Sequence, residues 1–180
     1  VAGATSRFAY WRAAAAGVAL HLALTVALVI ATRARTGGAM SYPLDDAFIH
    51  LALAKNLIHH GVFGVSRFAF TSTSSSVLWP FLLAPFEPIF GVYAPVVLAT
   101  LAAASLPVLA AALATEMKLP RGWVYGASIA AVLLAPTPGL AALGMEHALH
   151  APAARSRQAR HQQARQPPTK KRWMQRRRPE

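Results

Sequence analysis

Ala13–Thr32, with the sequence AAAAGVALHLALTVALVIAT, is the stretch that decides the fold class of this chain. An α-helix rises about 1.5 Å per residue, so about 20 apolar residues cross the hydrocarbon core of a bilayer. This stretch is longer than the apolar region of a secretory signal peptide, and the following Thr32-Arg33-Ala34-Arg35 lacks a small-residue cleavage pattern. The sequence therefore predicts an uncleaved membrane-spanning helix.

The composition agrees with a membrane protein. Of the 180 residues, 55% are hydrophobic and only 13% are charged, and there is no cysteine for a disulfide or a thiolate metal site. Two further apolar stretches, 92–114 and 123–143, are each long enough to cross a bilayer. We therefore expect an all-α integral membrane fold with about three transmembrane helices.

Two shorter helices are predicted in the first loop, between the first two spans. Asp45 is a good N-cap residue for a helix that ends near His60, with Gly61 as its stop signal. Residues 77–90 are apolar but carry three prolines, which favours a juxtamembrane or half-inserted helix.

The basic residues orient the predicted spans. With the N-terminus in the cytoplasm, the positive-inside rule places most basic residues near the spans on the cytoplasmic side: Arg7, Arg12, Lys118 and Arg121. Arg33 and Arg35 count against this orientation. On balance, the first loop and residues 144–147 are expected to face outward.

The last thirty residues have a different composition from the rest. Residues 151–180 hold ten of the 18 Lys and Arg residues and show no apolar periodicity. We therefore separate residues 1–150, a transmembrane region, from a basic low-complexity tail at 151–180, which we expect to be disordered or frameshift-derived. One alternative is a small membrane-anchored protein whose tail binds nucleic acid or anionic lipid. A non-enzymatic membrane subunit is another.

Two adjacent carboxylates, Asp45 and Asp46, are the most informative polar residues, because the chain has only six acids. They can cap a helix and complement its dipole, or act as a general base or a cation site. His50 follows Asp46 by one helical turn and can share a proton or a metal ion with it. Glu146 lies at the outer end of the last predicted span.

These pieces together resemble the GT-C class of membrane glycosyltransferases, in particular bacterial arabinosyl- and mannosyltransferases that use polyprenyl-phosphate sugars. The resemblance covers about residues 13–150. It rests on an N-terminal span followed by short motifs: Pro-Leu-Asp-Asp-Ala-Phe-Ile-His at 43–50, Ala-Lys-Asn-Leu at 54–57, Gly-Val-Phe at 61–63, Phe-Thr-Ser at 70–72, Leu-Trp at 78–79 and Gly-Met-Glu-His at 144–147.

The resemblance implies that Asp45 or Asp46 is the base that activates the acceptor hydroxyl, with Glu146 as a second acidic residue of the catalytic site beside it. It further implies substrate-binding roles for His50, Lys55 and His147, and a divalent Mg or Mn ion near Asp46 and His50.

The implied partners are the lipid bilayer and a lipid-linked sugar donor, with no specific nucleic acid. The implied location is the bacterial plasma membrane, with the acidic loop outside. Since such enzymes have more spans, we expect this chain to be an N-terminal fragment that is inactive alone.

Overall fold

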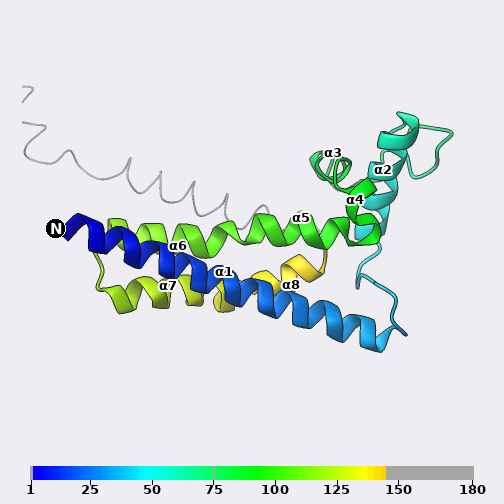
Figure 1. Cartoon of the computed structure of the whole chain (residues 1–180). Coiled ribbons are helices and arrows are strands. Elements are labelled where there is room, and N and C mark those ends of the chain that lie inside the picture. Colours follow the sequence, from blue (N-terminus) through cyan, green and yellow to red (C-terminus); the bar gives the residue numbers. More distant parts are fainter. Residues whose placement is uncertain (1, 75, 145–180) are drawn as a thin grey trace, which may run out of the picture.

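The computed structural model describes residues 2–74 and 76–144, and all regular secondary structure in these residues is helical. The long helices lie side by side along one direction, and shorter helices gather at one end of this bundle (Figure 1). The all-α prediction is therefore confirmed for the described residues.

Two helical stretches are long and apolar enough to cross a membrane. The first is Tyr10–Arg35, which belongs to helix α1 (Ala2–Arg35), and the second is Glu87–Glu116. The second consists of α4 (Glu87–Phe90), a 3₁₀ turn (Gly91–Tyr93), α5 (Ala94–Ala103) and α6 (Ser105–Glu116). The first two predicted spans therefore correspond to helices of sufficient length.

The third predicted span, 123–143, is not one continuous helix. It consists of α7 (Arg121–Leu134) and α8 (Thr137–Ala142), which are separated at Ala135 and Pro136. Prolines 136 and 138 have no backbone N–H to donate, so the hydrogen-bond ladder stops there. The 14 residues of α7 extend only about 21 Å, less than the hydrocarbon thickness.

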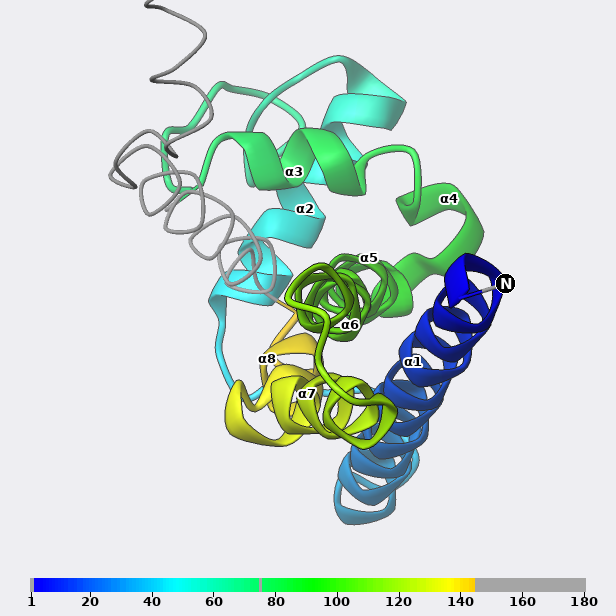
Figure 2. The same cartoon turned by 90° about the vertical axis from the view of Figure 1, so that its left-hand side faces the viewer.

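The helices of the first loop lie beside the end of the bundle where α1 ends and α5 begins. They are α2 (Asp46–His60) and α3 (Leu78–Leu83), and both run across the direction of α5 (Figures 1 and 2). The predicted stop of α2 is confirmed, since Gly61 has φ +66° and donates its N–H to Leu57 O. The single helix predicted at 77–90 is wrong, because the chain turns between α3 and α4 around Pro85.

Small side chains allow the long helices to approach closely. α7 folds back beside α6, and α1 packs against both (Figure 2). Their shared core is mostly alanine, with Ala13 and Ala14 from α1, Ala111 and Ala114 from α6, and Val124 from α7. Small residues are what membrane helices use at their contacts, so this composition fits packing within a bilayer.

His21, the titratable residue of the first apolar stretch, is fully buried between three helices. Its Nε2 lies 3.2 Å from the backbone oxygen of Thr100 in α5, and its Nδ1 lies 3.3 Å from the hydroxyl oxygen of Thr137 in α8. A neutral imidazole satisfies both contacts when Nε2–H donates to the carbonyl and Nδ1 accepts from the hydroxyl. His21 therefore joins α1 to α5 and α8 with its polar ring atoms paired, as buried polar groups generally are.

Candidate active site at one end of the bundle

Tyr42 holds the acidic segment, which carries Asp45 and Asp46, against the start of α5. Its hydroxyl donates to the carbonyl of Val92 at 2.8 Å and accepts the backbone N–H of Val96 at 3.2 Å. Val96 lies in the first helical turn, where backbone N–H groups have no partner within the helix. Tyr42 thus supplies from outside a cap that α5 does not obtain from its own N-cap residue, Tyr93.

Gly144 packs against Tyr42 although 102 positions separate them in the sequence. A Cβ atom at Gly144 would lie 2.6 Å from the Tyr42 ring and 2.9 Å from Pro95 Cβ. Its carbonyl accepts the indole N–H of the fully buried Trp79 at 3.2 Å. The end of α8, the acidic segment and α3 therefore meet at the start of α5.

Asp45 and Asp46 lie at the start of α2, three and four residues after Tyr42. The carbonyl of Asp45 accepts the N–H groups of Phe48 and Ile49, but its carboxylate makes no capping hydrogen bond. The reason is its helical backbone (φ −65°, ψ −27°), whereas a capping residue has an extended one. The predicted side-chain cap is therefore wrong. The carboxylate of Asp45 is exposed, and Asp46 is half-buried.

The other predicted site residues of α2 differ in their environment. His50, one turn after Asp46, is buried. Lys55 is exposed, and the nine positions between it and Asp46 correspond to about 180° around the helix. The structure therefore does not bring Lys55 to the acidic pair. Glu146 and His147 lie outside the described residues.

The described residues contain no group of three or more His, Asp or Glu side chains that could hold a metal ion. Mg²⁺ is commonly held by one or two carboxylates together with substrate phosphate oxygens and water. Asp45 and Asp46 fit that pattern as a pair, whereas the buried imidazole of His50 does not resemble the oxygen ligands that Mg²⁺ prefers.

Sequence reasoning missed three residues that shape this end of the molecule: Tyr42, Trp79 and Asn56. The Asn56 amide donates to the carbonyls of Gly64 at 2.8 Å and Val65 at 2.9 Å, and so holds the loop after α2. Trp79 and Asn56 stand inside motifs that carried the resemblance, and that position was the usable signal.

His59, at the end of α2, is exposed, and its Nε2 lies 3.1 Å from Oε2 of Glu87, the first residue of α4. This contact connects the end of α2 with the start of the second long helical stretch.

Comparison of the chain with protein-family models, with curated proteins and with solved structures gave no match. The resemblance to GT-C enzymes therefore rests on the motif residues alone. What the fold and the site define is a helical chain with two helices of membrane-spanning length and an acidic segment anchored at one end of them.

Proposed function

We propose that this chain is part of a membrane glycosyltransferase that transfers a sugar from a lipid-linked phosphate donor to an extracytoplasmic acceptor. The observation that carries the proposal is the contact between Gly144 and Tyr42. Gly144 begins the Gly-Met-Glu-His motif, and Tyr42 directly precedes the Pro-Leu-Asp-Asp motif. Two motifs of the resemblance thus begin at one place, although about 100 residues lie between them.

The position of this contact supports a lipid-borne substrate. Tyr42 and Gly144 lie where α1 ends and α5 begins, next to one end of both helices of membrane-spanning length. A sugar linked to a membrane lipid through a phosphate has its reactive carbon near the surface of the bilayer, which is where the ends of membrane-spanning helices lie. Soluble donors would need no such location.

The chemistry asks for a proton acceptor and for a partner of the donor phosphate. The carboxylate of Asp45 is exposed and can take the proton of an acceptor hydroxyl. Asp46 is the neighbouring carboxylate in the first turn of α2, where the helix dipole favours its charge. If a divalent ion is bound, it would neutralise the donor phosphate beside these two carboxylates.

The experiment has a binding arm and a transfer arm. The chain in proteoliposomes is labelled with a photoreactive polyprenyl-phosphate sugar, and unlabelled donor is expected to compete whereas a neutral prenyl alcohol is not. Asp45→Asn and Asp46→Asn are then placed in a longer relative with the same Pro-Leu-Asp-Asp motif, where transfer is expected to be lost while membrane insertion stays normal. A Glu116→Gln variant, an exposed acid at the far end of α6, is the matched control. Normal transfer in both aspartate variants would remove the catalytic assignment.

A further inference from the structure

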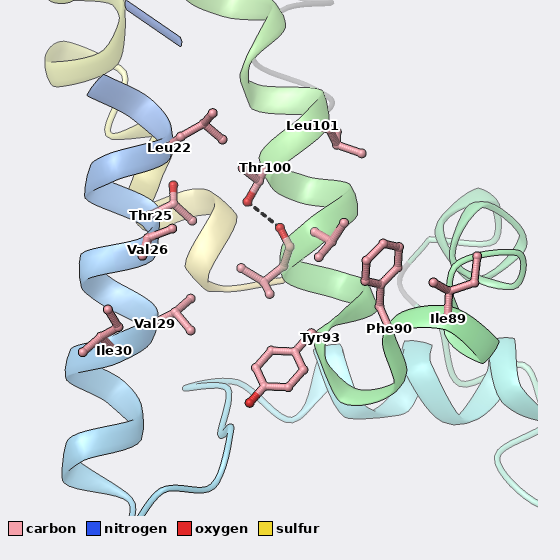
Figure 3. Close-up of a pocket in the computed structure, with 12 residues that line it drawn as sticks. Leu22, Thr25, Val26, Val29, Ile30, Ile89, Phe90, Tyr93, Thr100 and Leu101 are labelled. Atoms are coloured by element: carbon pink, nitrogen blue, oxygen red, sulfur yellow. Dashed lines mark hydrogen bonds between the residues drawn. The ribbon is translucent and has the colours of Figure 1, made fainter. Parts of the chain in front are cut away.

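An apolar groove of about 610 Å³ runs between the two helical stretches of membrane-spanning length. One wall comes from α1, and the other from α4, the 3₁₀ turn and α5 (Figure 3). Several of its large side chains are exposed, including Val26 at 56%, Ile30 at 62% and Ile89 at 74%. In a bilayer this groove opens toward the lipid chains.

The chemistry of the lining suits a flexible hydrocarbon chain. Leucine, isoleucine, valine and aromatic side chains make up nearly all of it. The two threonine hydroxyls are used within their own helices, since Thr25 donates to His21 O and Thr100 donates to Val96 O. Apart from the phenol of Tyr93, the walls therefore offer an occupant mainly apolar contact.

A second helix would suit this groove less well. Membrane helices approach one another where small residues line the contact. Of these small residues the lining here contains only two threonines, Thr25 and Thr100, and no glycine, alanine or serine. The groove between α6 and α7 has the opposite composition, with several alanines in its lining: Ala110, Ala114, Ala127, Ala130 and Ala131. The two grooves thus suit different occupants, and the one beside α1 suits an alkyl chain.

The groove has a polar end with a positive charge. Residues 22, 25, 26, 29 and 30 form one stripe along α1, and a further step of three residues from Ile30 reaches Arg33 on the same stripe. Arg33 is exposed and uses its Nε to donate to Gly38 O, which leaves its terminal amino groups for an anion. Tyr93 lines the groove near this end, as tyrosine does at membrane interfaces.

We infer that this groove binds an anionic phospholipid, with one acyl chain between α1 and α5 and the phosphate at Arg33. A guanidinium is well suited to a phosphate because its N–H groups match the phosphate oxygens in pairs. The inference is independent of sugar transfer. It gives a reason for Arg33 to lie at the end of α1 that we expect to face outward, although the positive-inside rule favours basic residues on the cytoplasmic side.

The test uses the full chain in phosphatidylcholine vesicles that contain a photoreactive phosphatidylglycerol. Crosslinks are expected in the peptides that carry residues 22–30 and 89–101. Val26→Trp fills the groove and should reduce this labelling severalfold, whereas Leu28→Trp, at an exposed α1 position outside the groove, should not. Ile89→Trp repeats the test from the other wall, and circular dichroism confirms that each variant is helical.

The headgroup is tested separately. Arg33→Gln should lower the affinity for phosphatidylglycerol about tenfold, which corresponds to about 1.4 kcal/mol, while Arg35→Gln, exposed but off the stripe, should leave it unchanged. Equal labelling of Val26→Trp and Leu28→Trp would overturn the groove assignment. Equal labelling by photoreactive phosphatidylcholine would overturn the anionic preference. A wild-type dimer that Val26→Trp dissociates would show that a helix occupies the groove instead.

Discussion

The indole N–H of Trp79 donates to the backbone carbonyl of Gly144 at 3.2 Å, across 65 positions of sequence and with the Trp79 side chain fully buried. The contact joins α3, which belongs to the first loop, to the end of α8. It is a polar contact between a loop helix and the end of the bundle, so it is a good place to probe their coupling.

Trp79→Phe keeps an aromatic ring and removes the N–H donor. The buried carbonyl of Gly144 then loses this partner, which costs about 1–3 kcal/mol, in addition to lost packing. The measurement is an SDS titration of the protein in detergent micelles, followed by circular dichroism. Trp123→Phe is the control, because that ring is 69% exposed. Similar midpoints for the two variants would contradict the structural role of the Trp79 hydrogen bond.

Tyr42→Phe removes the hydroxyl that links Val92 and Val96. Burial raises the pKa of the Tyr42 phenol above its ordinary value, the neighbouring Tyr93 adds to this rise, and the bond from Val96 N–H opposes it. A raised pKa in the folded protein means that the stabilisation is complete below about pH 10, the ordinary tyrosine value, and is lost as the pH rises through the folded pKa.

The expected result is that wild-type stability falls more steeply than that of Tyr42→Phe above pH 10. The check is an SDS titration repeated at increasing pH, with tyrosinate absorbance recorded in parallel. Tyr125→Phe, a partly buried tyrosine of α7, serves as the control. Parallel pH curves for wild type and Tyr42→Phe would show that Tyr42 ionisation is not linked to folding.

Three glycine-to-alanine variants separate backbone strain from steric conflict. Gly126 lies in α7 with open space around its Cβ position, so alanine there should be neutral or stabilising. Gly61 has φ +66° and open space, so alanine should cost about 1 kcal/mol. Gly144 combines φ +67° with the Tyr42 and Pro95 contacts, so alanine there should cost the most. Thermal unfolding in detergent measures the order of the three costs. An equal cost at Gly61 and Gly144 would contradict the close packing of Gly144 against Tyr42 and Pro95.

The orientation of the bundle can be read with single cysteines, because the chain contains none. Leu44 is 44% exposed beside the acidic pair, and Leu119 is 38% exposed in the turn between α6 and α7. A cysteine at Leu44 should react with an impermeant thiol reagent added outside the cell, and one at Leu119 should react only after permeabilisation. The reverse pattern would place the acidic pair in the cytoplasm. Ala47 is unsuitable for this purpose, since it is fully buried.

Local signals in the sequence predicted local structure well. The apolar run at 13–32 is inside one helix, and Gly61 ends α2 as expected, because both depend on length, hydrophobicity or backbone freedom at a single place. The break at Pro136 coincides with two prolines near the end of the predicted span 123–143. Proline kinks are tolerated within membrane helices, so composition alone did not decide between a kink and an end.

The candidate site was predictable only in part. Asp45 and Asp46 stand out because acids are rare in this chain, but their helix start uses no carboxylate cap. Tyr42 and Trp79 were missed, since each acts through a partner 50 or more positions away and looks like an ordinary core aromatic in sequence. Such pairings depend on tertiary packing, which no local pattern encodes.

The packing of Gly144 against Tyr42 and Trp79 also has a consequence for the order in which the protein assembles during synthesis. Tyr42 and Trp79 leave the ribosome long before Gly144 does, so this end of the protein stays incomplete until α8 has been made. During that interval the Trp79 N–H lacks its acceptor, and the first loop is open to proteases. A chain stopped at Leu134 should therefore be cleaved in the first loop faster than one stopped at His150. In this sense α8 closes this end of the bundle only late in synthesis.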